Sequence, residues 1–248
     1  MNNKTIVRLL IVFIAIIIYE IAARLEWIDP FTFIPFTKMV QEMFSILFDK
    51  QFFQEHLLVT FLEIIISFAS AVVFGFIIGL ILWRSKTTYY IVQPYLMLFY
   101  ATPFFALYPI FISIFGIGYL PVVILGTLFA MPAVISNTAI GFLEVKDVYI
   151  KVGKSFNMPL RKMITHIYLP AAWPYIFTGL KLASTYSVIA VIATEFILSA
   201  RGIGYSISYA YDNFDLEGMY GAILLVVSIS LTVNLTLNYI ESRLYAKA

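Results

Sequence analysis

Few side chains in this 248-residue chain have the types and spacing that catalysis or metal binding requires. There is no cysteine, which excludes disulfides, thiolate metal sites and cysteine nucleophiles. The two histidines, His56 and His166, are too far apart in sequence to form a local metal-binding motif. No grouping of His, Asp and Glu is typical of a catalytic centre. The sequence therefore predicts no catalytic residue, no metal site and a protein that is not an enzyme.

One short segment imitates a nucleotide-binding motif. Gly153-Lys154-Ser155 has the residues that end a phosphate-binding loop. The first glycine of that motif would stand at position 148, where the chain has Val148, and no strand is expected before it. We therefore predict that this chain binds no nucleotide or other cofactor, and that nucleic acid is not a partner.

The composition is typical of an integral membrane protein. Hydrophobic residues make up 62% of the chain and charged residues 12%, and the mean hydropathy is +0.93. A water-soluble domain needs far more polar groups to cover its surface. We therefore expect an all-α, polytopic bundle of membrane helices that forms a single domain over residues 1–248.

Six apolar segments are long enough to cross a bilayer, which takes roughly 20 residues of helix. No charged residue occurs between Thr87 and Leu143, which is enough length for two crossings, and residues 116–121 supply the break between them. Six crossings return both termini to one side. The expected spans are residues 6–23, 57–83, 89–115, 117–143, 172–199 and 218–240.

Lysine and arginine residues indicate the orientation of these spans, because they gather in cytoplasmic loops. Eleven fall on the side of the N-terminus, namely Lys4, Arg8, Arg84, Lys86, Lys146, Lys151, Lys154, Arg161, Lys162, Arg243 and Lys247. Four fall on the opposite side, namely Arg24, Lys38, Lys50 and Arg201. The sequence therefore predicts a multi-pass protein of the bacterial cell membrane with both termini in the cytoplasm.

The N-terminal region has two further features. A short basic start followed by an apolar run is also found in secretory signals, but Arg24 follows Ala22-Ala23 without a convincing cleavage site, so we expect a retained anchor. Residues 36–53 alternate apolar and polar side chains at helical spacing. This pattern predicts a helix that lies along the outer surface of the membrane.

Three ionisable residues fall within or at the margin of spans. We expect Glu63 to reach water rather than to serve substrate, and Lys181 to direct its amine towards the cytoplasmic surface rather than to act as a gate. Glu195, beside Thr194, lies near the outer end of the fifth span. Intramembrane acids are costly and often functional, so Thr194 and Glu195 are candidates for the translocation pathway.

Prolines in the third span are further pathway candidates. Pro94, Pro103 and Pro109 each lack a backbone donor and tend to bend a helix. Such bends either open a passage or only shape packing, and we name Pro103 and Pro109 as candidate pathway residues. Gly75 and Gly79, in contrast, have the spacing that permits close approach of two helices.

The segment 144–170 is a basic, amphipathic island in this apolar chain. Pro159 divides it into two short helical stretches. Apolar residues four apart line one side of the predicted helix, and they are Val148, Val152, Phe156, Leu160 and Ile164. Such a face needs a partner, which is either the bilayer surface or another protein.

The spacing within this island resembles a known motif. Lys151-Val152-Gly153 is followed after three residues by Asn157, and after nine more by Ile167-Tyr168-Leu169-Pro170. This arrangement is similar to the cytoplasmic motif of permeases of ATP-binding-cassette (ABC) importers, which reads Glu-Ala-Ala, three residues, Gly, nine residues, Ile, one residue, Leu-Pro. The chain departs from it at three positions, with Lys151 for Glu, Gly153 for Ala and Asn157 for Gly. Asn tolerates the left-handed conformation that a helix-ending Gly would supply.

Further segments resemble the nitrate, sulfonate and taurine branch of that family. They are residues 101–109, 115–118, 169–180, 194–196 and 202–205. The sequence Gly-Ile-Gly-Tyr occurs at both 116–119 and 202–205, which is explained either by helix termination or by a remnant of internal repetition.

The resemblance implies a fold like that of type I ABC importer permeases and a role in uptake by alternating access. It also implies docking of the segment 144–170 to a separate ATPase subunit through Lys151, Val152, Gly153, Lys154, Ser155, Phe156, Asn157, Leu169 and Pro170. The implied partners are two ATPase subunits that carry ATP and Mg, an extracytoplasmic substrate-binding protein and a second permease copy. The implied solute is a sulfonate, taurine or a nitrate-like anion, or alternatively a vitamin precursor. A secondary carrier or channel that works without ATP is the alternative function.

Overall fold

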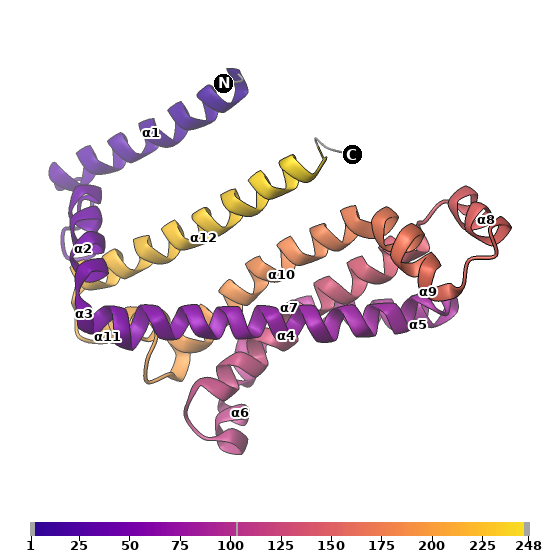
Figure 1. Ribbon diagram of the computed structural model, residues 1–248. Coiled ribbons are helices and arrows are strands. Elements are labelled where there is room, and N and C mark those ends of the chain that lie inside the picture. The colour runs from indigo at the N-terminus through magenta and orange to yellow at the C-terminus, as the bar shows by residue number, and fades with distance from the viewer. Residues whose placement is uncertain (1–2, 103, 246–248) are drawn as a thin grey trace.

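The computed structural model describes residues 3–102 and 104–245, and these residues form helices and connecting loops with no strand (Figure 1). In chain order the elements are α1 (Asn3–Arg24), α2 (Phe36–Phe48), α3 (Lys50–Phe52), η1 (Phe53–Leu57), α4 (Leu58–Trp83), α5 (Lys86–Ala101), η2 (Phe104–Leu107), α6 (Tyr108–Phe115), α7 (Tyr119–Leu143), α8 (Asp147–Ser155), α9 (Leu160–Met163), η3 (Ile164–Tyr168), α10 (Leu169–Leu198), α11 (Ile203–Asp212) and α12 (Leu216–Tyr245). The predicted all-α class is confirmed.

Five helical stretches are long and apolar enough to cross a bilayer, and they contain α1, α4, α7, α10 and α12. The predicted third span, residues 89–115, is not one helix. Its two parts, Lys86–Phe99 and Phe104–Phe115, meet at an angle of 76°, so they form either a broken span or a re-entrant loop. Pro94 lies inside α5 and Pro109 in the first turn of α6, whereas Pro103 lies outside the described residues.

Helix α7 is the centre of the bundle and packs against α4 on one side and α10 on the other. The contact with α4 depends on glycine. A Cβ atom added at Gly75 would lie 2.7 Å from Val134 Cβ, and one at Gly79 would lie 2.7 Å from Thr138 Cβ. The two glycines therefore permit the close approach of helices that the sequence predicted.

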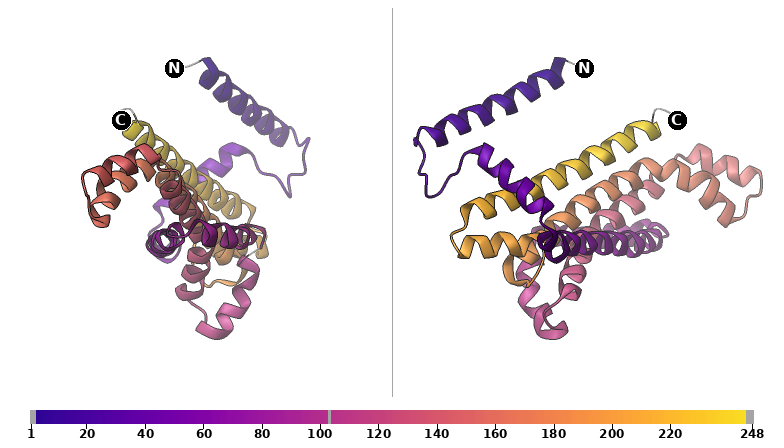
Figure 2. Two further views of the ribbon diagram at one scale, coloured as in Figure 1. Left: turned by 90° about the vertical axis from the view of Figure 1, so that its right-hand side faces the viewer. Right: turned by 60° about the vertical axis from the view of Figure 1, so that its left-hand side comes forward.

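Helix α1 lies apart from the bundle and meets it at α2 (Figures 1 and 2). The predicted helix in residues 36–53 is confirmed as α2, although it ends at Phe48 and α3 follows Asp49. Its apolar face contacts protein, because Met43 and Leu47 pack against a cluster that includes Ile203 and Leu225. Helix α2 thus joins α11 and α12 instead of lying free on the membrane surface.

The molecule has two distinct ends (Figure 1). The α8 end carries α8 and α9, and the first turn of α1 and the last turn of α12 point in its direction. The α11 end carries α2, α3 and α11. This arrangement agrees with the prediction that the two chain termini and the basic island lie on one side.

Candidate functional site

The α8 end presents an apolar surface that the rest of the chain does not cover. Val148 and Val152 project from α8, Phe156 follows its last residue, and all three side chains are exposed, Phe156 by 74%. Lys151 and Lys154 are exposed beside them, and they make no ion pair within the described part of the chain. A mixed apolar and basic surface of this kind is available to a partner.

A tight turn ends this surface at Asn157. Asn157 has φ of +50°, and the Met158 N–H donates to Gly153 O at 3.0 Å, which closes the end of α8. The prediction that Asn157 takes the left-handed role of a glycine is confirmed. The prediction that one helical face continues from Val148 to Ile164 is wrong, because this turn and Pro159 separate α8 from α9.

Gly153 lets α8 approach the helix that leads into the membrane. Gly153 is buried, and a Cβ atom there would collide with Ile167 Cδ1 of η3. Even an alanine at this position would therefore displace Ile167. The departure of Gly153 from the usual Ala of the motif thus has a local packing reason.

The two halves of the predicted motif meet in a shallow groove. Its volume is about 340 Å³ and its lining residues are Tyr149, Val152, His166, Ile167, Pro170 and Ala171. Pro170 is the second residue of α10, which continues directly from η3. The fold therefore brings Val152 of the first half beside Pro170 of the second. Ser155 Oγ donates to Val152 O at 2.8 Å. No contact among the described residues explains the charge of Lys151.

At the α11 end, Glu195 is fully buried and accepts hydrogen bonds from neighbouring helices. Thr60 Oγ1 donates to its carboxylate at 2.7 Å, and the Gly204 N–H donates at 2.8 Å. Thr60 Oγ1 also accepts from the Ile203 N–H at 2.8 Å. Glu195 and Thr60 thus satisfy the first backbone donors of α11, and they tie α4, α10 and α11 together. Thr194 is buried and donates to Ala190 O of its own helix.

The two Gly-Ile-Gly-Tyr sequences both lead into helices but differ in where the helix begins and in their surroundings. Helix α7 begins at Tyr119, the fourth residue of its copy, whereas α11 begins at Ile203, the second residue of its copy. Gly116 and Gly202 both have positive φ, at +79° and +100°, and they precede α7 and α11. A Cβ atom at Gly118 would meet nothing within 4 Å, whereas one at Gly204 would collide with Ile192 O and lie 2.7 Å from Glu195 Cβ. Only the second copy therefore packs closely against the helix bundle, with no room for a side chain at Gly204.

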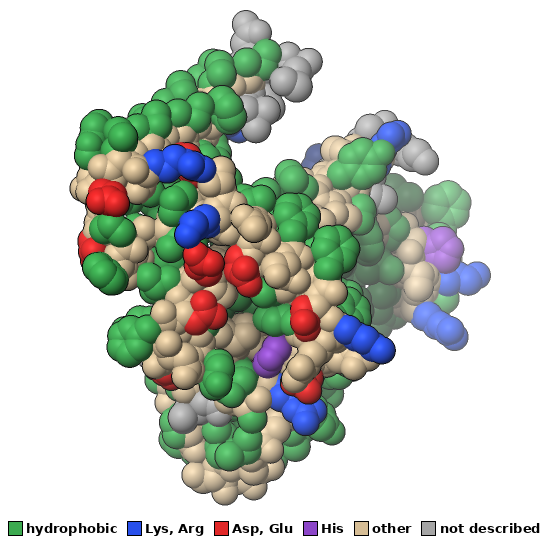
Figure 3. Space-filling model, turned by 90° about the vertical axis from the view of Figure 1, so that its left-hand side faces the viewer, with side chains coloured by type: hydrophobic (Ala, Val, Ile, Leu, Met, Phe, Trp, Pro, Cys, Tyr) green, Lys and Arg blue, Asp and Glu red, His purple; other side chains and the backbone are tan. Residues whose placement is uncertain are grey.

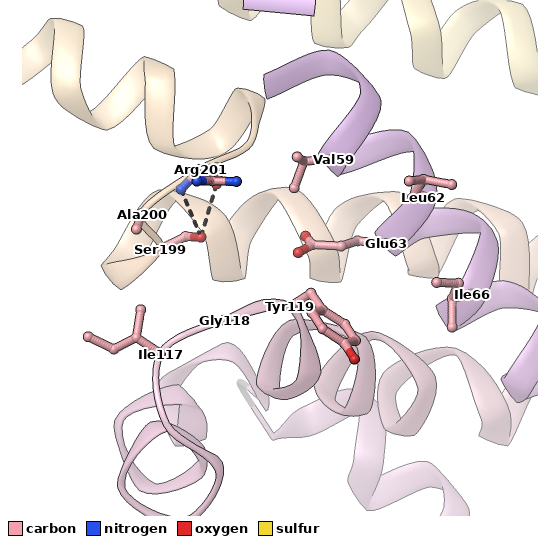
Figure 4. A pocket seen from close by; sticks show the side chains of 10 residues that line it. All are labelled: Val59, Leu62, Glu63, Ile66, Ile117, Gly118, Tyr119, Ser199, Ala200 and Arg201. Atoms are coloured by element: carbon pink, nitrogen blue, oxygen red, sulfur yellow. Dashed lines mark hydrogen bonds between the residues drawn. The ribbon is translucent and has the colours of Figure 1, made fainter. Parts of the chain in front are cut away.

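Glu63 is the residue that the sequence placed wrongly. Its side chain does not extend into bulk water, because Glu63 is only 4% exposed and lines a pocket of about 530 Å³ (Figure 4). The sequence of α4 contains a pattern that could have predicted the burial of Glu63. The small and polar residues of α4 recur three or four apart on its buried face, and they are Thr60, Glu63, Ser67, Ala71, Gly75 and Gly79.

The structure also places Lys181 and Pro109, two other residues that the sequence singled out. Lys181 Nζ forms an ion pair with Glu241 Oε2 of α12 at 2.9 Å, with both side chains partly exposed. Pro109 is exposed at the start of α6, whereas Thr194 and Glu195 are buried.

Comparison with known proteins identifies the family. Residues 71–245 match the family described as "Binding-protein-dependent transport system inner membrane component". The chain belongs to this family. It is the permease subunit of an ABC importer and not an enzyme, and ATP is hydrolysed by a separate subunit.

Curated relatives agree with this assignment. The permease is 26% identical over 243 residues to a probable ABC transporter permease protein of Haemophilus influenzae, covering 98% of each chain. It is 25% identical to the taurine transport system permease protein TauC of Escherichia coli, covering 90% of this chain and 82% of TauC. It is 26% identical to the nitrate import permease protein NrtB of Synechocystis, covering 73% of this chain and 66% of NrtB.

A solved structure supports the fold. The permease resembles a chain of the MetNI methionine ABC transporter in an inward-facing conformation, with a TM-score of 0.64 and 18% identity. The match covers 75% of the permease and 92% of that chain. The predicted architecture of a type I importer permease is therefore confirmed.

The buried corner at Gly204 generates a stability prediction. Gly204→Ala should lower the free energy of unfolding by about 2 kcal/mol or more, because the added methyl group collides with backbone. Gly118→Ala is the matched control in the other Gly-Ile-Gly-Tyr sequence, and we expect a change below about 0.5 kcal/mol. Thermal unfolding of the detergent-solubilised variants tests this prediction. Equal stability of the two variants would contradict the close packing of Gly204 against α10.

Proposed function

We propose that α8 and the turn at Asn157 dock into the ATPase subunit and transmit its movement to the membrane helices. The observation that carries the proposal is the uncovered surface of Val148, Val152 and Phe156, flanked by Lys151 and Lys154. A soluble partner with a groove for apolar side chains and acidic residues at its rim would complement it. The cation at Lys151 then meets an acid on the partner, which accounts for the charge reversal in the motif.

The connection from α8 into the bundle is short. Gly153 packs on Ile167 of η3, and η3 runs without a break into α10. Helix α10 in turn packs along α7. A displacement of α8 by the ATPase therefore reaches the central helices of the permease directly, and we propose that this drives the alternation between outward and inward openings.

The importer further requires partners that supply energy and solute. Permeases of this family work with an ATPase and a substrate-binding protein. ATP and Mg are expected on the ATPase, and this chain is proposed to bind no cofactor. A second permease copy is proposed to complete the pathway. Helix α1 supports this, because only 6% of its apolar span is buried by its own chain.

The charge distribution supports an orientation for the complex. The α8 end carries Lys146, Arg161 and Lys162 in addition to the docking surface. Figure 3 looks onto the opposite end, where acidic side chains gather over α2, α3, α11 and the start of α12. By the preference of basic residues for the cytoplasm, we propose that the α8 end and both termini are cytoplasmic.

We propose that the transported molecule is a small polar solute. The relatives are named as permeases for taurine, nitrate, glycine betaine and bicarbonate. Sulfonates, taurine and nitrate-like anions are therefore the first group of candidates, and a vitamin precursor is the second.

Phe156→Asp should abolish co-purification of the ATPase with the permease. The substitution places a charge at the most exposed apolar position of the docking surface, where desolvation on binding would cost several kcal/mol. Pull-down from membranes that contain both subunits measures the effect. Phe31→Asp is the matched control, since Phe31 lies between α1 and α2 and is also highly exposed, by 89%. A normal yield of the permease–ATPase complex with Phe156→Asp would contradict docking at this site.

Single cysteines should report the orientation, because the chain has no native cysteine. A membrane-impermeant maleimide applied to intact spheroplasts is expected to label Asn213→Cys at the α11 end and to leave Ser155→Cys unlabelled until the cells are opened. Both positions are exposed. Labelling of Ser155→Cys in intact spheroplasts would reverse the proposed topology.

Reconstituted uptake tests the function as a whole. Proteoliposomes that contain the permease, the ATPase and the binding protein should accumulate the solute only when ATP is present at the face that carries α8. The control omits the ATPase. Uptake that persists without ATP or the ATPase would favour a carrier or channel instead.

A further inference from the structure

The pocket beside Glu63 has the character of a ligand site. It lies near the α11 end, between α4, the loop that precedes α7 and the loop that precedes α11 (Figure 4). Its volume of about 530 Å³ is large enough for a small organic molecule. The walls are mainly apolar and include Val59, Leu62, Ile66 and Ile117. Charges inside such walls interact more strongly than in water.

Glu63 projects into this pocket from α4 (Figure 4). Its Oε2 atom is buried and accepts no hydrogen bond from the described residues. A buried carboxylate oxygen without a partner is costly, so an external donor would stabilise it. The fully buried Glu195 lies beside Glu63, and the two carboxyl groups share a hydrogen bond. The oxygens of Glu195 also accept from Thr60 and Gly204, so only Oε2 of Glu63 lacks a partner within the described residues. Glu63 is therefore the carboxylate available to a ligand.

The juxtaposition of the two acids makes a cationic donor the best partner. Two carboxylates side by side repel each other in a buried site unless a positive group offsets them. A shared proton would reduce the repulsion. An ammonium group would reduce it and also supply the hydrogen bond that Glu63 Oε2 lacks.

A positive side chain lines the same pocket. Arg201 extends over it from the loop before α11 (Figure 4). Its guanidinium forms no hydrogen bond or ion pair with any side chain in the described ranges, including Glu63. Arg201 and Glu63 are thus opposite charges at one cavity that do not neutralise each other.

We propose that this pocket binds a zwitterion, whose ammonium group donates to Glu63 and whose anionic group accepts from Arg201. A simple anion would meet Arg201 but face the unpaired carboxylate, and a simple amine would leave Arg201 without a counter-charge. The chemistry is shared by a small transported zwitterion and by the headgroup of an ethanolamine phospholipid. For the transported solute, this inference rests on the proposed function and narrows its substrate class from anions to zwitterions.

Three related compounds separate the two charges. Taurine carries an ammonium and a sulfonate, isethionate replaces the ammonium by a hydroxyl, and ethanolamine replaces the sulfonate by a hydroxyl. Equilibrium binding of radiolabelled taurine is measured on the permease–ATPase complex in nanodiscs of phosphatidylcholine and phosphatidylglycerol. Unlabelled taurine should displace the label at concentrations at least about tenfold lower than either analogue, since each analogue loses one charge-assisted contact. Absence of saturable taurine binding, or equal displacement by isethionate, would overturn the proposal.

Substitutions of Glu63 and Arg201 test which residue binds each charged group of taurine. Glu63→Gln keeps the size of the side chain and should weaken taurine binding at least about tenfold while leaving isethionate unchanged. Glu63→Asp keeps the charge and should retain part of the affinity. Arg201→Gln should weaken taurine similarly and leave ethanolamine unchanged. The control Glu217→Gln removes an exposed acid that pairs with Lys38, and taurine binding should not change. Unaltered taurine binding to Glu63→Gln would refute the ammonium contact.

A lipid arm distinguishes the two sources of the zwitterion. Replacing phosphatidylcholine by phosphatidylethanolamine should lower taurine binding if the headgroup enters the site, and this loss should disappear in Glu63→Gln. Unchanged taurine binding in ethanolamine lipid supports a solute site. Stimulation of ATP hydrolysis by the binding protein is recorded on the same complexes. If the binding protein stimulates ATP hydrolysis but the complex does not bind taurine, only the proposed ligand pocket is overturned. If the binding protein does not stimulate ATP hydrolysis, the proposed coupling to the ATPase is overturned.

Discussion

Close packing of α7 between α4 and α10 is the constraint on which the rest of this permease depends. Lipid tails are as apolar as leucine, so burial of apolar surface does not by itself drive membrane helices together. The contact has to come from shape, and small residues supply it. Gly75 and Gly79 admit Val134 and Thr138 of α7, and Gly179 of α10 admits Asn137. The shorter elements take their positions from these three helices.

Two acids in this apolar bundle show how the same residue type takes different roles. Glu195 is fully buried, and its oxygens accept from a hydroxyl and a backbone N–H, so it acts as a clasp that fixes the start of α11. Glu63 is almost as buried, but it lines a pocket and its Oε2 atom accepts no hydrogen bond from the described residues. Hydrogen-bond satisfaction, and not burial alone, therefore separates a structural acid from one that is available to a ligand. Sequence position near the outer boundary suggested the opposite assignment.

The α8 end and the α11 end are connected through α10. At one end η3 brings the exposed surface of α8 into contact with the start of α10. At the other end Glu195, near the last turn of α10, holds α11 and lies beside Glu63. A single helix thus joins the proposed docking surface to the proposed ligand pocket. This geometry gives the coupling between ATP hydrolysis and solute movement a physical route.

The sequence by itself determined the membrane class and five of the expected spans, and it predicted their common orientation and the docking segment. These follow from local quantities, namely apolar length, basic residues in loops and the spacing of residues 151–170. Only the tertiary structure decided that Lys86–Phe99 and Phe104–Phe115 meet at 76°, that α11 forms a separate helix and that Glu63 lines a pocket. Each of these depends on which groups from distant segments meet. Hydrogen bonds such as that of Thr60 to Glu195, 135 residues apart, leave no trace in local composition.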